Sequence, residues 1–271
     1  MIRVSFQGER GAYSEAAARS FFNEEIEAVP LATFSKVIES TTKDTTHCAI
    51  LPVENSLEGS VGESYDLLYS TSLNAIGEIY HRIEHCLIGI GELDEIDTVS
   101  SHPQALGQCR KFIEEHHMKT IPAYDTAGSI KEVKELKKEN FAGIASKDAA
   151  EIYRMPIISD NIADNPNNYT RFLILSKTNS EQTDNDKTSI IFSIKHEPGT
   201  LYKIIESFHK ENVNLTKIES RPTKVNTWEY NFYADFEGHR DDPKILGMLE
   251  KIKQETIFMK VLGSYPSTKL S

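Results

Sequence analysis

Short apolar runs alternate with helical spacings along the first part of the chain. Residues 2–6 form a β-type run that ends at a glycine-rich turn, and a helix with alanines on one face follows. Apolar residues with helical spacing at 34–38 precede a buried strand at 47–51, which we expect to stop at Pro52. The repeated order of strand, turn and helix indicates parallel α/β organisation.

The middle of the chain continues this pattern. Residues 76–90 are rich in β-forming residues. Further strands are predicted at 96–99, 141–145 and 172–175, and helices at 101–113, 125–137 and 148–153. Ser101, followed by Pro103 and Gln104, has the pattern of a capping box at a helix start.

Residues 178–187 contain no apolar side chain, which is typical of a linker. After it, Ile190, Phe192 and Ile194 alternate as one face of a strand, and residues 201–208 have the spacing of an amphipathic helix. The remaining predicted elements are strands at 215–220, 228–236 and 258–262, a polar turn at 224–227, and a helix around 245–252. This β-α-β-β-α-β order predicts a ferredoxin-like fold, which does not by itself assign a function.

The charge balance limits the choice of partners. The formal net charge is −11, so the surface repels phosphate backbones and nucleic acid is not an expected partner. An anionic ligand would have to be held locally, by arginine side chains or by the free N–H groups of helix N-termini.

The same composition predicts a cytoplasmic protein. Cys48, Cys86 and Cys109 are too few and too irregularly spaced for a disulfide framework or a zinc ribbon. The N-terminal sequence has no signal-peptide pattern, and no apolar run is long enough to span a membrane, so no membrane partner is expected.

Neither nucleotide nor metal chemistry has a clear signature. The Gly8-x-x-Gly11 turn lacks the third glycine of a dinucleotide fingerprint, and it fits a tight turn and an anion-binding turn about equally well. His81 and His85 have the spacing of a helical metal pair, but their segment reads as a strand, which breaks that geometry. We therefore expect no metal site.

Three polar positions permit two interpretations each. Asn55, with Ser56, either caps a following helix or contacts a ligand at the end of a strand. Ser101 presents the same alternatives. Arg171 is either a surface charge or the bidentate anchor of a carboxylate.

Eight segments occur in order along nearly the whole chain. They are GERGAYSE (8–15), PVENS (52–56), SHPQALGQC (101–109), DTAGS (125–129), GIASKDAA (143–150), NNYTRF (167–172), EPGTL (197–201) and IESRP (218–222). Each alone is a weak signal, but the ordered set resembles prephenate dehydratase with its attached C-terminal ACT regulatory domain. One departure is that the family's effector loop usually reads GALV, whereas residues 199–202 read GTLY.

The resemblance implies a carbon–oxygen lyase of phenylalanine biosynthesis that converts prephenate to phenylpyruvate, carbon dioxide and water, with no metal or organic cofactor. It also implies an α/β fold. Residues 1–177 would form a two-lobed catalytic domain like a periplasmic binding protein, 178–187 the linker, and 188–266 a ferredoxin-like ACT domain.

The family's active site can be carried onto matching positions here. The resemblance implies that Thr170 donates a proton or hydrogen bond to the leaving hydroxyl, with Glu54 as the rival acid, and that Arg171 binds a carboxylate. Ser14 and Thr126, at helix starts, would add N–H donors. The full expected set is catalytic Thr170, Asn55, Ser101 and Gln108, and substrate-binding Arg171, Ser14, Glu54, Ser56, Thr126 and Phe172.

The resemblance further implies that L-phenylalanine is an allosteric effector, bound where two ACT domains meet in a homodimer or homotetramer. The expected effector residues are Gly199, Thr200, Leu201, Glu219, Ser220, Arg221 and Pro222. Two other functions stay open: an arogenate dehydratase, and a non-catalytic small-ligand-binding or sensor protein of the same fold.

Overall fold

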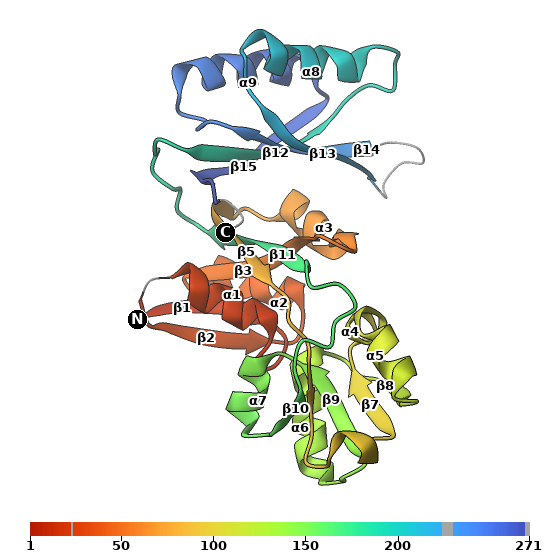
Figure 1. Ribbon diagram of the computed structural model, residues 1–271. Helices are drawn as coiled ribbons and strands as arrows, with labels where there is room; N and C mark the ends of the chain where they lie inside the picture. Colours follow the sequence, from red (N-terminus) through yellow and green to blue (C-terminus); the bar gives the residue numbers. More distant parts are fainter. Residues whose placement is uncertain (23, 224–229, 269–271) are drawn as a thin grey trace. The chain divides into compact units, whose positions relative to one another are not determined.

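The computed structural model describes residues 1–22, 24–223 and 230–268, which form two compact units (Figure 1). The first comprises Met1–Ser64 and Ile79–Phe172, and the second Tyr65–Glu78 and Leu173–Ser271. The second unit begins at Leu173, before the expected linker at 178–187, and it also includes Tyr65–Glu78. The domain boundary expected at that linker stays a prediction.

The first sheet has the strand order β2-β1-β3-β11-β5, with β4 paired to β3. Its strands are β1 (Ile2–Gln7), β2 (Ile26–Leu31), β3 (Cys48–Asn55), β4 (Gly59–Ser60), β5 (Asn74–Arg82) and β11 (Tyr169–Ser176). Helices α1 (Tyr13–Phe21) and α2 (Phe34–Thr42) pack against β1 and β3. The pairing of β1 with β2 and β3 is parallel, as the strand–helix alternation predicted.

The expectation that the third strand stops at Pro52 is wrong. β3 continues through Pro52 to Asn55. Its ladder with β1 pairs Val4 with Cys48 and Ser5 with Ala49, so Pro52 lies beyond that ladder, where a missing N–H donor is tolerated. The extension carries Asn55 to the end of the sheet.

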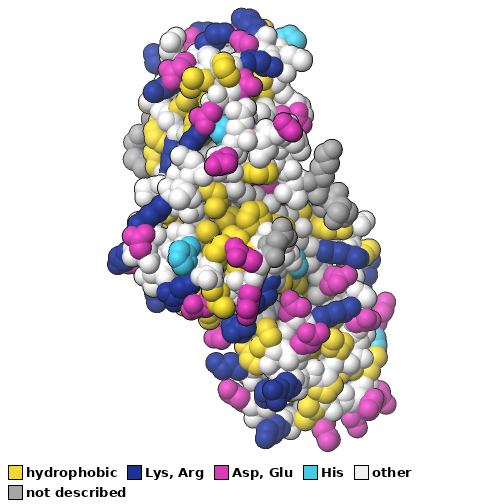
Figure 2. All heavy atoms as spheres, turned by 90° about the vertical axis from the view of Figure 1, so that its left-hand side faces the viewer, with side chains coloured by type: hydrophobic (Ala, Val, Ile, Leu, Met, Phe, Trp, Pro, Cys, Tyr) yellow, Lys and Arg dark blue, Asp and Glu magenta, His cyan; other side chains and the backbone are white. Residues whose placement is uncertain are grey.

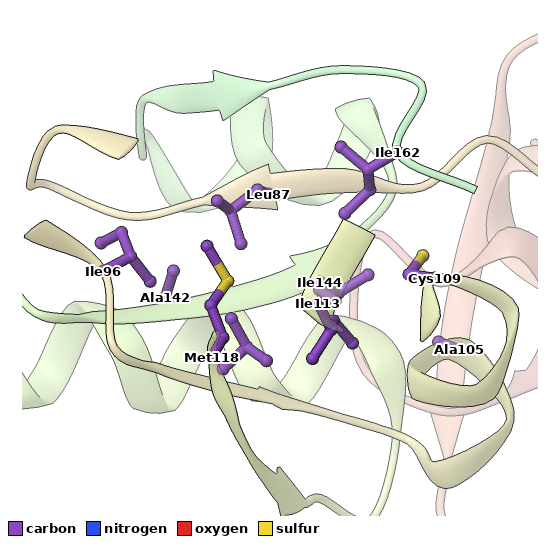
Figure 3. Close-up of a cluster of buried hydrophobic side chains, with 10 residues drawn as sticks. Leu87, Ile96, Ala105, Cys109, Ile113, Met118, Ala142, Ile144 and Ile162 are labelled. Carbon is purple, nitrogen blue, oxygen red and sulfur yellow. The ribbon is translucent and has the colours of Figure 1, made fainter. Parts of the chain in front are cut away.

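The second sheet has the order β10-β6-β9-β7-β8. It consists of β6 (Cys86–Ile88), β7 (Thr98–Ser101), β8 (Lys119–Pro122), β9 (Phe141–Ala145) and β10 (Ile157–Ser159), with η1 (Leu93–Glu95), α4 (Pro103–Gln108), α5 (Arg110–Glu115), α6 (Thr126–Leu136) and α7 (Lys147–Tyr153) around it. Leu87, Ile144 and Ile113 lie in a core cluster under α5 (Figure 3). This unit thus contains two separate sheets, and its division into two lobes stays a prediction.

The capping box predicted at Ser101 is wrong. Ser101 ends β7 as a buried strand residue, and His102 is the N-cap of α4, with Nδ1 accepting from Gln104 N at 3.3 Å. The single helix expected at 101–113 is divided into α4 and α5 at Cys109.

The second unit contains the predicted β-α-β-β-α-β order. Its elements are β12 (Asp186–Ser193), α8 (Thr200–Lys210), β13 (Leu215–Pro222), β14 (Tyr230–Glu237), α9 (Pro243–Glu255) and β15 (Phe258–Pro266), in a sheet of order β13-β14-β12-β15. Both helices cover one face of this sheet (Figure 1). The predicted turn at 224–227 and the start of the predicted strand at Trp228 lie outside the described residues.

A buried ion pair ties the start of this sheet to the 65–78 segment. β12 begins inside the expected linker, and Lys187 Nζ lies 2.5 Å from Glu78 Oε1, with both side chains buried. The preceding helix α3 (Gly62–Ser70), which sequence reasoning missed, packs on the same unit, since Tyr233 Oη donates to Tyr65 O at 3.0 Å. Residues 65–78 are thus structural parts of the second unit.

On the face of the molecule that Figure 2 shows, acidic and basic side chains are intermingled. The excess of acidic residues is therefore not gathered into one patch on that face. The described residues include no helix whose length and apolar content suit it to span a membrane.

Candidate functional site

The first unit contains a cavity of about 450 Å³. Its lining comes from strands of the first sheet and from the starts of several helices: the end of β3, the first residues of β11, and the first residues of α1, α2, α4 and α6. Strand ends and helix starts of an α/β fold are where ligands commonly bind, because unpaired backbone donors collect there.

Thr170 and Asn55 are neighbours in the lining of this cavity. Thr170 lies on β11 and Asn55 at the end of β3, and both are buried. Asn55 Nδ2 donates to Thr170 Oγ1 at 3.0 Å. The Thr170 oxygen therefore accepts from a neighbour, and its own hydroxyl hydrogen is available as a donor.

A chain of polar side chains continues from this pair. Asn55 Nδ2 also donates to Asn168 Oδ1 at 2.7 Å, and Asn168 Nδ2 donates to Gln108 Oε1 at 2.9 Å. The same Gln108 oxygen lies 2.9 Å from His85 Nε2, and His85 Nδ1 lies 2.9 Å from Tyr13 Oη. Buried groups with mutual hydrogen bonds are held in one arrangement, so this network is preorganised.

The described lining of this cavity offers an anion helix starts in place of lysine or arginine side chains. Among the described residues that line it, none is a lysine or arginine. Ser14 of α1, Phe34 of α2 and Thr126 of α6 line it instead, and each lies in the first turn of its helix. Free N–H groups and the positive end of the helix dipole favour anions at such places.

Two acidic residues, Glu63 and Asp125, also line the cavity. Asp125 caps α6, with Oδ1 accepting from Gly128 N at 2.6 Å. Burial raises the pKa of Asp125, against the opposing effect of that hydrogen bond.

The turn before α1 is held by Glu15. Gly11 has a left-handed backbone (φ 88°), and Glu15 Oε2 accepts from its N–H at 2.9 Å. Arg10 and Arg19 both pair with the same carboxylate. Burial alone would raise the pKa of Glu15, but the hydrogen bonds from Gly11, Arg19 and Arg10 together lower the pKa. Both arginines thus serve the helix start rather than the cavity.

Six of the expected site residues lie together in the cavity lining: Thr170, Asn55, Gln108, Ser14, Thr126 and Phe172. Thr170 and Phe172 project from alternate positions of β11, as the two-residue period of a strand requires. Asn55 does not cap a helix as one interpretation had it; its Oδ1 accepts from Leu57 N and Glu58 N, each at 3.0 Å, in the turn between β3 and β4.

Four expected residues do not line the cavity in the described structure: Arg171, Glu54, Ser101 and Ser56. Arg171 is adjacent to Thr170 on β11 and Glu54 is adjacent to Asn55 on β3, so strand alternation turns both to the opposite face. Ser101 is buried and donates to Ile144 O at 2.6 Å. Ser56 Oγ donates to Asn167 O at 3.1 Å and accepts from Tyr169 N at 3.0 Å, so it fastens the segment before Thr170.

Sequence reasoning missed His85, Asn168 and Tyr13. His85 and Tyr13 line the cavity, and Asn168 is fully buried beside it. Asn168 and Tyr13 lie within two of the segments that carry the resemblance, NNYTRF and GERGAYSE, so these motifs could have identified both residues. His85 was considered only as a metal ligand, and no group of three potential ligands for a metal ion occurs among the described residues.

The second unit has a pocket of about 690 Å³. Of the expected effector residues, Gly199 and Leu201 line it, whereas Thr200, Glu219, Ser220, Arg221 and Pro222 are not part of its described lining. The last four lie on β13, an edge strand of the sheet. Gly199 has a left-handed backbone (φ 84°) as the N-cap of α8, a conformation that favours glycine.

Comparison with known proteins identifies the family to which this chain belongs. The prephenate dehydratase family model matches residues 4–180. The bifunctional chorismate mutase/prephenate dehydratase of Aquifex aeolicus is 36% identical over 99% of this chain and 75% of its own. The prephenate dehydratase of Methanocaldococcus jannaschii is 37% identical over 95% of both chains. Arogenate dehydratase/prephenate dehydratase 2 of Arabidopsis thaliana is 37% identical over 98% of this chain and 73% of its own.

Solved structures agree over the whole chain. Prephenate dehydratase from Arthrobacter aurescens in complex with L-Phe has a TM-score of 0.90 at 29% identity, covering 98% of this chain and 90% of that one. A protein described as GqqA, a quorum-quenching acylase, has a TM-score of 0.89 at 31% identity, covering 98% of each chain.

Proposed function

This chain belongs to the prephenate dehydratase family, and we propose that it converts prephenate to phenylpyruvate with loss of carbon dioxide and water, as a step of phenylalanine biosynthesis. The observation that carries this proposal is the Thr170 hydroxyl, which lines the cavity while its oxygen accepts from Asn55 Nδ2 at 3.0 Å.

For this reaction, the main task of the protein is to position the substrate and the hydrogen-bond donors around it. Losing one carboxylate and the ring hydroxyl makes the ring aromatic, which supplies the driving force. The site has to hold a dianion, leave the departing carboxylate weakly solvated, and stabilise the leaving hydroxyl with a donor. Neutral donors fixed in a small cavity meet these needs.

We assign the donor role to Thr170. A threonine hydroxyl is a poor acid, so it acts as a positioned hydrogen-bond donor to the leaving oxygen, which departs as hydroxide and takes the proton that makes it water from solvent. Glu54, the rival acid of the sequence analysis, is not proposed further because it does not line the cavity in the described structure. The Gln108 amide is a second neutral donor at the same wall.

The starts of α1 and α6 take the carboxylate-binding role that was expected of Arg171. Ser14 and Thr126 line the cavity in the first turns of these two helices. Their backbone N–H groups and hydroxyls are donors for the two carboxylates. With this arrangement, no full positive charge lies beside the departing carboxylate. Such a charge would stabilise the carboxylate and oppose its loss as carbon dioxide.

Arogenate, the amino analogue of prephenate, is the second candidate substrate. The specific observation in its favour is that Glu63 and Asp125 line the cavity, because a carboxylate suits the ammonium group of arogenate. A spectroscopic assay of the purified protein with each substrate decides between them, and turnover of neither would reject both and favour the non-catalytic alternative.

The second unit is proposed to be an ACT domain that binds L-phenylalanine. Its β-α-β-β-α-β order, the pocket at Gly199 and Leu201, and the L-Phe complex of the related Arthrobacter enzyme support this. Because Glu219–Pro222 lie on an edge strand and not in that pocket, we propose that a second copy of the chain supplies them, so that the minimum assembly is a homodimer.

Calorimetry with L-phenylalanine tests the effector site. Binding that also lowers turnover is the expected result, because an effector that prefers a less active state shifts the population toward it. Absence of binding at millimolar phenylalanine would remove the regulatory part of the proposal and leave the catalytic part intact.

A further inference from the structure

We infer that His85 is a positioning residue for the reaction. Together with Asn168 it holds the Gln108 oxygen, so that the Gln108 amide nitrogen is left as a donor for the bound substrate. His85 is buried, lines the cavity, and lies 2.9 Å from Gln108 Oε1 through Nε2. This inference rests on the proposed function, since it names what aims one donor of that site.

The orientation of the network is fixed from the backbone outward. The N–H groups of Leu57 and Glu58 both donate to one atom of the Asn55 amide, at 3.0 Å each. Only an oxygen accepts from two N–H groups, so this atom is Oδ1 and the Asn55 nitrogen faces the other way, toward Thr170.

Each following amide inherits its orientation from the one before. The Asn55 nitrogen donates to Asn168 Oδ1 at 2.7 Å, which leaves the Asn168 nitrogen to donate to Gln108 Oε1 at 2.9 Å. Reversing any amide would bring two N–H groups face to face. The atom that Gln108 presents to His85 is therefore an oxygen, and His85 Nε2 has to carry a hydrogen.

The other side of the imidazole faces the Tyr13 hydroxyl. Burial lowers the pKa of His85, against the opposing effect of its bond to Gln108, so the ring is neutral at pH 7. With the hydrogen on Nε2, Nδ1 is a bare acceptor that lies 2.9 Å from Tyr13 Oη. Tyr13 Oη also donates to Glu84 O at 2.7 Å, so its single hydroxyl hydrogen is shared between two acceptors, the Glu84 oxygen and His85 Nδ1.

As a consequence, the oxygen of the Gln108 amide is occupied by hydrogen bonds from its neighbours, whereas its nitrogen can still donate to a ligand. Its Oε1 accepts from Asn168 and His85, whereas its Nε2 has a long 3.5 Å contact with Glu58 Oε1. In a lining whose described residues include no lysine or arginine, each aimed neutral donor is a large share of the anion-stabilising capacity. Without His85, Gln108 Oε1 keeps only the hydrogen bond from Asn168, and the orientation of the Gln108 Nε2 donor is less well fixed.

Three substitutions of His85 separate this role from simple packing. His85→Gln places an amide nitrogen near the position of Nε2 and keeps the donor to Gln108. His85→Asn is shorter and places its amide near Nδ1, so that donor is lost. His85→Leu fills the volume and removes both polar atoms. Tyr13→Phe is the matched control on the far side of the ring, because it removes the Nδ1 partner and keeps the Nε2 contact.

We expect His85→Asn and His85→Leu to lower kcat for prephenate about 10²-fold, as misaimed catalytic groups do. KM should change less than about three-fold, and His85→Gln should keep kcat within about five-fold of the wild-type value. Thermal unfolding of each variant checks that the fold is intact. Equal losses in Gln and Asn variants of the same thermal stability, or near-normal kcat in His85→Leu, would overturn the inference.

Nitrogen NMR of the protein with ¹⁵N-labelled histidine gives a readout that does not depend on turnover. The His85 signal, assigned by its loss in His85→Gln, should show a protonated Nε2 and a bare Nδ1 at pH 7. A proton on Nδ1 alone would contradict the network and refute the inference while the proposed reaction stands. If the wild-type protein turns over no prephenate, the proposed function fails, and the NMR result still decides the tautomer.

Discussion

The cavity of the first unit and the pocket of the second differ in how far one chain completes them. In the cavity, Thr170, Asn55 and Gln108 are anchored to one another or to neighbouring residues of the same unit. In the pocket, only two of the seven expected effector residues line the wall, and four lie on the edge strand β13. The hydrogen-bonded residues of the cavity thus lie within one unit, whereas we propose that a second copy of the chain completes the effector site.

The largest effect is expected in the cavity. Replacing Thr170 with alanine removes the proposed donor to the leaving hydroxyl and should lower kcat about 10³-fold, or ~4 kcal/mol of barrier. Thr170→Ser keeps the hydroxyl and is the matched control. Steady-state kinetics with prephenate measures both variants, and near-normal turnover of the alanine variant would show that the donor lies elsewhere.

A smaller effect is expected from the ion pair of the second unit. Lys187→Met removes the buried cation that lies beside the Glu78 carboxylate and should lower the free energy of unfolding by about 3 kcal/mol. Adding Glu78→Leu should recover most of that loss, because no charge is then left buried. Chemical denaturation of the three proteins provides the values. Failure of the double variant to recover would mean that packing, not charge, holds the 65–78 segment to this unit.

The comparison is sharpened by two changes in the second unit. Leu201→Ala trims the pocket wall and should weaken L-phenylalanine binding about ten-fold, a cost of ~1.4 kcal/mol. Arg221→Ala, on β13, should weaken binding by a similar factor if a second copy completes the site. Calorimetry measures both, with uninhibited turnover as the control. Unchanged affinity in Arg221→Ala would mean that one chain forms the whole site.

The smallest effect concerns pH and the turn before α1. The lowered pKa of Glu15 means that the folded state favours its ionised form, so Glu15 stabilises the fold above its unfolded pKa of about 4.3. That stabilisation is lost as the pH falls through the lower folded pKa. Glu15→Gln should therefore be less stable than wild type at pH 7, with a difference that shrinks below about pH 4. Denaturation curves at several pH values measure it.

Glu132→Gln, at an exposed position of α6, is the control for this comparison. Its difference from the wild-type protein should stay small across the same pH range, because an exposed carboxyl changes little in environment on folding. A pH-independent difference for Glu15→Gln would contradict the role of its ionised carboxylate.

Periodicity predicted the elements well where each buries one face. The strands at 2–6 and 141–145 and the amphipathic helix at 201–208 correspond to β1, β9 and α8. Helix α3 was missed because its apolar residues do not form a single stripe. The β10 strand has three residues, too few for a pattern.

The site was predictable only in part. Ordered motifs identified Thr170, Asn55 and Gln108, yet they do not say which way a side chain points. The strand was predicted only from residue 172, whereas β11 begins at Tyr169. The two-residue strand period that turns Thr170 and Arg171 to opposite faces was therefore not applied to this pair. His85 could not be found from local sequence, because its role depends on Gln108 and Tyr13, which are far from it along the chain.

The lack of lysine and arginine in the described lining bears on how the product leaves. Prephenate enters with two carboxylates, and phenylpyruvate departs with one. Helix N-termini attract anions over a short range and more weakly than a paired guanidinium does. The product therefore binds more weakly than the substrate, because it has lost half of the ligand's charge. Product release then does not require a tight ion pair to dissociate.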